Sequence, residues 1–224
     1  GENGAGKSTL MKVLAGLYQP DDGEILLGGQ PVVLHDPGAA RKRGIAMIPQ
    51  ELSLVPDMSV ADNIFVGEEP RSGIFVDHSA MRRAAREQLA KLNADIDPSM
   101  PVRQLSIARK QMVEIARALS CDADILIMDE PTAALGNEDA QRLLDTIVDL
   151  KNQGKIVFYI SHRIPEIMAI ADHVWILRDG VLVADYEAAE LTTERIIAAM
   201  AGASSTRQAS EGRQSQPGQV LLDV

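Results

Sequence analysis

Residues 1–9 read GENGAGKST, which fits the pattern G-x-x-x-x-G-K-[ST] of a phosphate-binding loop. Glycines at positions 1, 4 and 6 let the backbone curl until successive N–H groups point into one concavity. The helix expected after the loop adds the positive end of its dipole to that anion site. A glycine turn that only caps a helix is the plainer alternative. The stretch nevertheless predicts phosphate binding, with Lys7 reaching the β- and γ-phosphates and the Ser8 hydroxyl binding Mg²⁺.

The composition limits the classes of protein to which the chain can belong. Hydrophobic residues make up 46% of its 224 residues, which is enough for a sizeable core. The formal net charge of −10 argues against nucleic acid as a main partner, because phosphate backbones attract basic surfaces. Cys121 is the only cysteine, so no internal disulfide can form, which fits a reducing cytoplasm. No apolar run approaches the roughly 18 residues of a membrane span. The acidic net charge does not exclude docking on a membrane protein through a small local surface.

Apolar strands alternate with helices along much of the chain. Short apolar strands are expected at 45–48, 125–128 and 156–160, and helices at 107–119 and 137–152. This alternation is typical of a parallel sheet that is covered on both faces. The section 59–100 follows a helical pattern, with Ser59 and Ser79 as expected N-caps, and 174–184 follows the pattern of a hairpin.

The two ends of the sequence predict that it is part of a longer protein. A phosphate-binding loop normally follows a buried strand, so we expect strands before residue 1. Residues 1–201 are expected to form one domain, and 202–219 have the composition of a flexible linker. The apolar pattern resumes at 220–224, as expected for the first strand of a second domain; a disordered tail is the alternative.

Polar residues directly after the predicted strands are candidates for the site, because open α/β sheets bind ligands at the carboxyl ends of their strands. Asp129 can hold Mg²⁺ through water, and Glu130 can orient or deprotonate an attacking water; a solvated acidic pair is the alternative. Gln50 can touch the metal or the water, although an ordinary loop glutamine is the plainer interpretation. His162 can donate a hydrogen bond to a γ-phosphate, although a lone histidine is more often structural. Ser106 opens a helix and forms a second anion-binding feature, which is surplus unless it serves another subunit's nucleotide.

The order of the motifs resembles the ATP-binding cassette of ABC transporters over about residues 1–200. The motifs run GENGAGKST, IPQE, LSIARKQMVEIARAL, ILIMDEPTAAL and ISHR, and their finer texture resembles ATPases of two-cassette importers for ribose, xylose and galactose. The resemblance implies an α/β P-loop NTPase fold with a mostly parallel sheet, a helical subdomain at about 59–120 and a small antiparallel β portion. It also implies that 220–224 start the second cassette.

The resemblance also implies the roles of individual residues. Glu130 would act as general base, His162 would sense the γ-phosphate, and Gln50 would couple the nucleotide to the permease. Ser106 would contact the ATP held by the opposing cassette. The metal ligands would be Ser8, Gln50 and Asp129. The nucleotide-binding residues would be Gly1, Asn3, Gly4, Ala5, Gly6, Lys7, Ser8 and Thr9.

A sugar importer of this kind would use ATP and Mg²⁺ and hydrolyse ATP to drive monosaccharide uptake across the cytoplasmic membrane. It would lie peripherally on the cytoplasmic face of the inner membrane. Its partners would be membrane permease subunits, a second cassette and, indirectly, a periplasmic or extracellular sugar-binding protein, with no nucleic acid. The alternatives are a soluble two-cassette ATPase that acts on ribosomes or nucleic acid, an importer ATPase for another solute, and a regulatory module without turnover. Glu130 argues against the last of these.

The sequence departs from the family pattern at two places that matter for contact across a cassette pair. The usual LSGGQ signature is replaced by Ile107, Ala108 and Arg109 after Leu105 and Ser106, which predicts a weaker contact. Gly136 stands where an Asp is common. The aromatic residue that stacks on adenine normally precedes the phosphate-binding loop, so we expect this stretch alone to be a poor ATPase.

Overall fold

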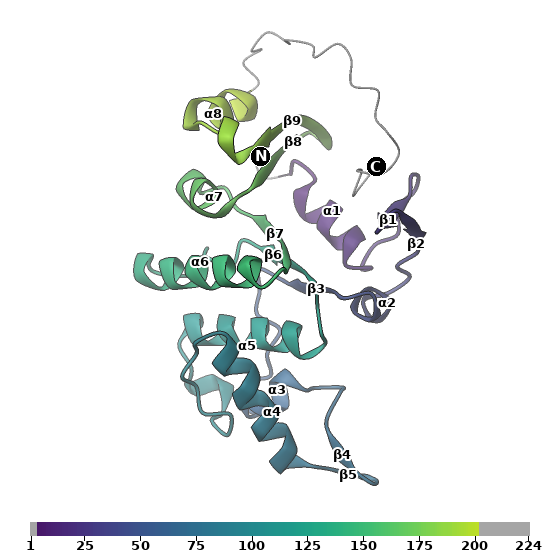
Figure 1. Ribbon diagram of the computed structural model, residues 1–224, viewed down its shortest axis with the longest axis vertical. Helices are drawn as coiled ribbons and strands as arrows, with labels where there is room; N and C mark the ends of the chain where they lie inside the picture. The colour runs from purple at the N-terminus through teal and green to yellow at the C-terminus, as the bar shows by residue number, and fades with distance from the viewer. Residues whose placement is uncertain (1–3, 202–224) are drawn as a thin grey trace. The chain divides into compact units, whose positions relative to one another are not determined.

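The computed structural model describes residues 4–201, which form two compact units (Figure 1). Unit 1 contains residues 4–42 and 162–201, and unit 2 contains residues 43–161. The predicted linker at 202–219, the predicted strand at 220–224, and Gly1 and Asn3 of the phosphate-binding loop lie outside the described residues.

Unit 2 is built on a three-stranded parallel sheet in the order β3-β6-β7. The strands are β3 (Ile45–Ile48), β6 (Ile125–Asp129) and β7 (Ile156–Ile160). The three apolar residues in the middle of β6 have no exposed surface, and neighbouring strands pair with both edges of β6. The three predicted strands and their parallel pairing are therefore confirmed.

Four helices complete the described part of unit 2: α3 (Val60–Ile64), α4 (His78–Lys91), α5 (Ile107–Ser120) and α6 (Asn137–Asn152). Helix α5 packs against β3, α3 and α4, and α6 packs against β7. The buried face of α6 is formed by Ala140, Leu143, Leu144, Ile147 and Leu150. The apolar pattern of 137–152 predicts Val148 on this face as well, which is wrong: Val148 is 36% exposed, because it lies about 100° around the helix from Ile147. A short 3₁₀ helix (Val102–Gln104) leads into α5.

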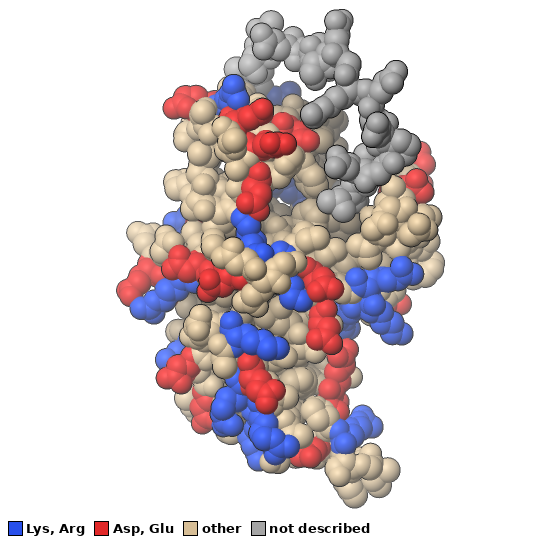
Figure 2. All heavy atoms as spheres, viewed as in Figure 1, with Lys and Arg blue, Asp and Glu red and all other residues tan. Residues whose placement is uncertain are grey.

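The section 59–100, which was predicted to be helical, contains a β-hairpin, and one of its helices has a different N-cap from the one expected. The hairpin, β4 (Arg71–Ser72) with β5 (Phe75–Val76), lies at the end of unit 2 beyond α4, where Figure 2 shows an uncharged tip. Ser59 caps α3 as predicted. The prediction for Ser79 was wrong: α4 begins at His78, and the Asp77 carboxylate accepts hydrogen bonds from two N–H groups of its first turn.

The first segment of unit 1 carries α1 (Lys7–Leu14), the antiparallel pair β1 (Ile25–Leu27) and β2 (Gln30–Val32), and α2 (Pro37–Lys42). The sequence pattern predicts a helix that ends near Gly16, strands at 24–27 and 32–34 and a helix at 36–43. Each of these elements lies within a few residues of its predicted position, because each is set by a local pattern of glycine, proline and apolar residues.

The second segment of unit 1 carries α7 (Ile164–Ile170), β8 (His173–Arg178), β9 (Val181–Glu187), a 3₁₀ turn (Ala188–Glu190) and α8 (Thr193–Ala201). The antiparallel pairing of β8 with β9 confirms the predicted hairpin. One face of the hairpin packs into a core cluster of Val174, Ile176, Leu191 and Ile196. Within residues 4–201, no helix has both the length and the apolar character that crossing a bilayer requires.

Candidate functional site

The described part of the phosphate-binding loop has the backbone that its glycines were expected to allow. Gly4 and Gly6 have φ angles of 85° and 92°, a region that residues with a Cβ rarely enter. Gly6 is also the residue that caps the N-terminus of α1. A Cβ built on Gly6 would lie 3.4 Å from the Cα of Gly180, an ordinary contact, so a side chain there would be strained by its backbone conformation and not by lack of space.

The turn between β8 and β9 supports this loop within unit 1. The Gly180 N–H donates a hydrogen bond of 3.2 Å to the Ala5 carbonyl, and Ala5 is buried. The sequence analysis missed Gly180 as a support for the loop. Its only local signal is the turn sequence Arg178-Asp179-Gly180, which predicts a hairpin but does not indicate what the turn contacts.

The residues predicted to contact phosphate and metal form the first turn of α1. Lys7 and Ser8 are half-buried, and Thr9 is exposed. The first turn contains no acidic residue. An anion at this end of the helix therefore meets the positive end of the dipole without a competing carboxylate.

The acidic pair stands at the carboxyl end of the central strand of unit 2. Asp129 is the last residue of β6 and is 7% exposed. Glu130 follows with a φ of 47°, and its N–H donates to the Ile160 carbonyl at 3.0 Å. A residue with a Cβ in the left-handed region costs free energy, and it persists where the surrounding structure fixes it, as at active sites. The turn thus holds Glu130 in a fixed, strained position next to a buried carboxylate.

The remaining candidates are exposed side chains at element ends. Gln50 is the second residue after β3, and parallel pairing places the ends of β3 and β6 at the same edge of the sheet. Unit 2 therefore brings Gln50, Asp129 and Glu130 to one edge. His162 is an exposed residue at the start of the second segment of unit 1. Ser106 is the N-cap of α5, where its hydroxyl accepts a hydrogen bond from the Arg109 N–H at 3.4 Å.

The donor set fits magnesium better than a metal held entirely by protein. Among residues 4–201, no three His, Cys, Asp or Glu side chains gather as a metal site. Magnesium usually keeps several waters and binds through one or two protein oxygens together with substrate phosphates. The Ser8 hydroxyl and the Asp129 carboxylate are groups of this kind. The curled loop and helix end of unit 1 suit the phosphates of ATP, and in unit 2 the Asp129 carboxylate is a group that Mg²⁺ accepts.

Comparison with solved structures identifies the fold of the chain. The crystal structure of a nucleotide-free ATP-binding cassette from an ABC transporter superposes with a TM-score of 0.72, with 25% identity over 83% of this chain and 78% of that one. The ADP conformation of another ATP-binding cassette of an ABC transporter superposes with a TM-score of 0.73, with 25% identity over 89% and 81% of the two chains. The predicted fold, an ABC ATPase cassette, is confirmed.

Longer bacterial proteins are similar to the chain along its whole length. A protein of Burkholderia lata named as a ribose/galactose/methyl galactoside import ATP-binding protein is 49% identical over 100% of this chain and 44% of its own length. A protein of the same name from Pseudomonas fluorescens is 48% identical, again over 100% of this chain and 44% of its own length. The chain thus spans less than half the length of these relatives. The family model described as ABC transporter matches residues 1–133, and the chain therefore belongs to the ABC transporter family.

Proposed function

We propose that the complete protein uses this chain to bind and hydrolyse ATP, and that hydrolysis drives uptake of a monosaccharide across the cytoplasmic membrane. The observation that carries the proposal of hydrolysis is the buried Asp129 followed by the strained Glu130 at the end of β6. The proposal of sugar import is supported by relatives named as ribose/galactose/methyl galactoside import ATP-binding proteins.

The proposed binding step uses the loop and the first turn of α1. The backbone N–H groups of the curled loop point toward the phosphates, and Lys7 neutralises part of their charge. The Ser8 hydroxyl and the Asp129 carboxylate are the groups that would hold Mg²⁺, Asp129 through water. Mg²⁺, when bound, neutralises charge on the phosphate oxygens and fixes their geometry. Gly1, Asn3, Gly4, Ala5, Gly6 and Thr9 complete the proposed nucleotide-binding set.

The proposed hydrolytic step assigns one proton transfer to Glu130. Water attacks the γ-phosphorus, its proton passes to the Glu130 carboxylate, and the bond from the γ-phosphorus to the ADP oxygen breaks. His162 donates a hydrogen bond to the γ-phosphate. The strained backbone of Glu130 fixes the direction of its carboxylate before ATP arrives, which lowers the cost of orienting it during the reaction.

The proposed coupling connects hydrolysis to other proteins. Gln50 contacts the metal or the attacking water. It thereby couples the nucleotide to the membrane permease. Ser106 contacts the ATP held by a second cassette, which the greater length of the relatives accommodates. The assembly lies peripherally on the cytoplasmic face of the inner membrane, with a sugar-binding protein acting indirectly outside it. The net charge of −10 supports the absence of a nucleic-acid partner.

The substitution Glu130→Gln in the complete protein tests the hydrolytic role. Because Gln keeps the shape but cannot take the proton, kcat should fall by about 100-fold or more while ATP affinity is retained. A phosphate-release assay and a nucleotide-binding titration measure the two quantities. Glu138→Gln, an exposed position on α6, is the matched control and should hydrolyse ATP normally. Undiminished turnover in Glu130→Gln would remove Glu130 from the role of base.

The transport role is tested by purification and reconstitution. The complete protein should co-purify with a membrane permease, and proteoliposomes containing both should accumulate labelled ribose or galactose only with ATP. Co-purification with ribosomes instead would overturn the proposal. Uptake of a solute other than a sugar would retain the ATPase role and correct the substrate.

A further inference from the structure

Glu114 is a buried carboxylate in the middle of α5 that no step of the proposed reaction uses. Its side chain is 4% exposed. One carboxylate oxygen accepts hydrogen bonds from the Ser53 N–H at 2.7 Å and from the Ser53 hydroxyl at 3.0 Å. Arg117, one turn further along α5, donates to the same hydroxyl at 3.3 Å. Burying a carboxylate is costly unless it is hydrogen-bonded, so the contact with Ser53 determines where Glu114 can lie.

Ser53 belongs to the loop that follows Gln50, and this loop is also fastened to α3. Asn63, which is 1% exposed, accepts a hydrogen bond from the Val55 N–H at 2.7 Å and donates one to the Val55 carbonyl at 3.1 Å. Both contacts of Asn63 with Val55 are hydrogen bonds, which depend on direction as well as distance. The loop is therefore held in one conformation although its side chains are largely exposed.

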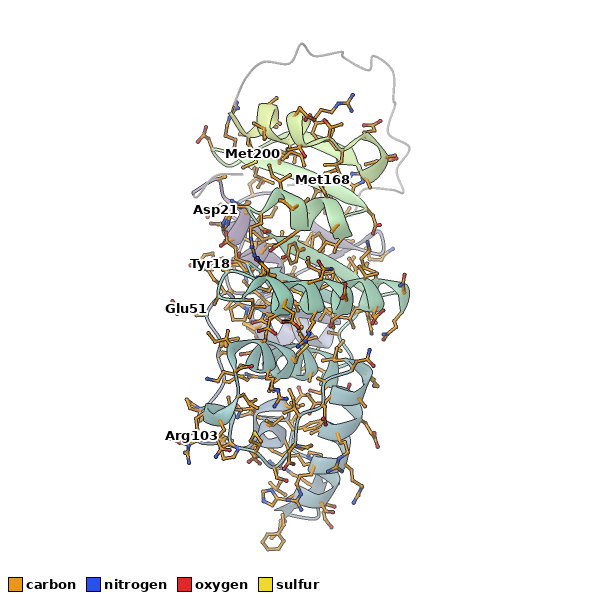
Figure 3. The ribbon with its side chains drawn as sticks, turned by 90° about the vertical axis from the view of Figure 1, so that its left-hand side faces the viewer. Tyr18, Asp21, Glu51, Arg103, Met168 and Met200 are labelled. Atoms are coloured by element: carbon orange, nitrogen blue, oxygen red, sulfur yellow. The ribbon has the colours of Figure 1, made fainter. Side chains whose placement is uncertain are left out.

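The same loop is joined to the segment that leads into α5. The Arg103 N–H donates to the Pro56 carbonyl at 2.8 Å, and the Val102 N–H donates to the Met58 carbonyl at 3.1 Å. The Arg103 guanidinium also forms an ion pair with Asp57, and Figure 3 shows Arg103 at the outer edge of unit 2. The loop is thus hydrogen-bonded at two places, to the segment that leads into α5 and to Glu114 within α5.

These two attachments link the positions of Gln50 and Ser106. Gln50 lies three residues before Ser53, and Ser106 caps the helix that carries Glu114. Glu114 lies eight positions after Ser106 in the sequence, a rise of about 12 Å along a rigid element. These hydrogen bonds connect the loop to α5 at two points along a rigid element.

We propose that Glu114 is a positioning residue that passes displacements of the Gln50 loop to α5 and so to Ser106. The inference rests on the proposed function, because it takes Gln50 to face the nucleotide and permease and Ser106 to face a second nucleotide. Glu114 itself touches neither. Its role is to join the Gln50 loop to α5, so that the two segments move together.

The test compares Glu114→Ala, Glu114→Gln and Leu89→Ala in the complete protein reconstituted with its permease. Glu114→Ala should reduce permease-stimulated ATP hydrolysis about tenfold while the ATP affinity stays unchanged. Glu114→Gln should restore most of the stimulation, because its amide oxygen can still accept both Ser53 hydrogens. Leu89→Ala removes a buried side chain of α4 and should lower the melting temperature without this loss of stimulation. Equal losses in Glu114→Ala and Leu89→Ala, or full stimulation in Glu114→Ala, would overturn the inference.

Amide hydrogen exchange provides a readout that does not depend on turnover. On addition of ATP, exchange at 53–58 and at 107–110 should change together in the wild-type protein, whereas Glu114→Ala should retain the first change and lose the second. A wild-type protein in which ATP alters one stretch without the other would contradict the inference. Failure of the wild-type protein to bind or hydrolyse ATP would contradict the proposed function itself, so the two failures are distinguishable.

Discussion

Gly6 shows how one residue can tie local conformation to ligand binding. Its φ of 92° places it where an L-residue is strained, and it is the residue at which the loop passes into α1. The Cα of Gly180 occupies the space beside it. Any residue with a Cβ would therefore favour a loop that is less curled, with its N–H groups turned away from one another.

Gly6→Ala should weaken ATP binding roughly tenfold, because restoring the left-handed conformation costs an L-residue roughly 1–2 kcal/mol. A titration with a fluorescent ATP analogue measures the change. Gly73→Ala is the matched control: Gly73 has a φ of 66° in the β4–β5 turn, with no heavy atom within 4 Å of a Cβ built there. It should bear a similar strain and bind ATP normally. Equal affinity of Gly6→Ala and wild type would show that the curled loop is not needed for binding.

At the scale of single elements, the start of α4 depends on one carboxylate. Hydrogen bonds from the backbone N–H of Ala80 and then of Ser79 lower the pKa of Asp77, an effect partly offset by desolvation. A carboxyl group whose pKa is lowered on folding stabilises the folded state above its ordinary pKa of about 4. That contribution is lost as the pH falls through the lowered folded-state value.

Asp77→Ala should therefore speed hydrogen exchange of the Ser79 and Ala80 amides at neutral pH, because both lose their acceptor. Asp77→Asn keeps an acceptor oxygen and should protect these amides at neutral and at acid pH alike. The difference between wild type and Asp77→Ala should shrink only well into the acid range, as the pH falls through the lowered pKa of the Asp77 carboxyl and this group becomes protonated. Amide exchange followed by NMR measures it. A difference that grows on acidification would contradict the assigned cap.

At the scale of the whole molecule, the central strand of unit 2 is part of a buried core, while the surface of that unit is charged. Figure 2 shows both signs of charge interspersed over the visible surface of this unit, so the surface carries no single strong field there. The interior is different, because β6 has a paired strand on each edge and no exposed apolar surface in its middle. The packing around β6 also supports the strained turn that carries Asp129 and Glu130.

Leu126→Ala should lower the free energy of unfolding of unit 2 by about 2–5 kcal/mol, since it leaves a cavity at a position with no exposed surface. Val148→Ala, on the exposed side of α6, is the control and should cost less than about 1 kcal/mol. Hydrogen exchange of the β6 amides under native conditions measures both. Similar costs for the two substitutions would mean that β6 is not the centre of this core.

Much of the fold could be read from the sequence because it depends on local patterns. The glycine loop, the three apolar strands and the helices at 107–119 and 137–152 follow from residue spacing alone, and the order of motifs identified the family. The positions of Gln50, Asp129 and Glu130 at one sheet edge also follow, since parallel strands share their carboxyl ends. The roles of these residues stay predictions until the substitutions are measured.

Only the tertiary structure decided which polar groups are buried and what they hold. Glu114 looks like one more charged residue of a helix, yet it meets Ser53, which lies 61 residues earlier in the chain. The contact of Gly180 with Ala5 joins two segments of unit 1 that are even further apart. Spacing along the chain determines which face a residue occupies within its own element. Which groups meet across elements depends on how those elements pack, and local sequence does not encode that.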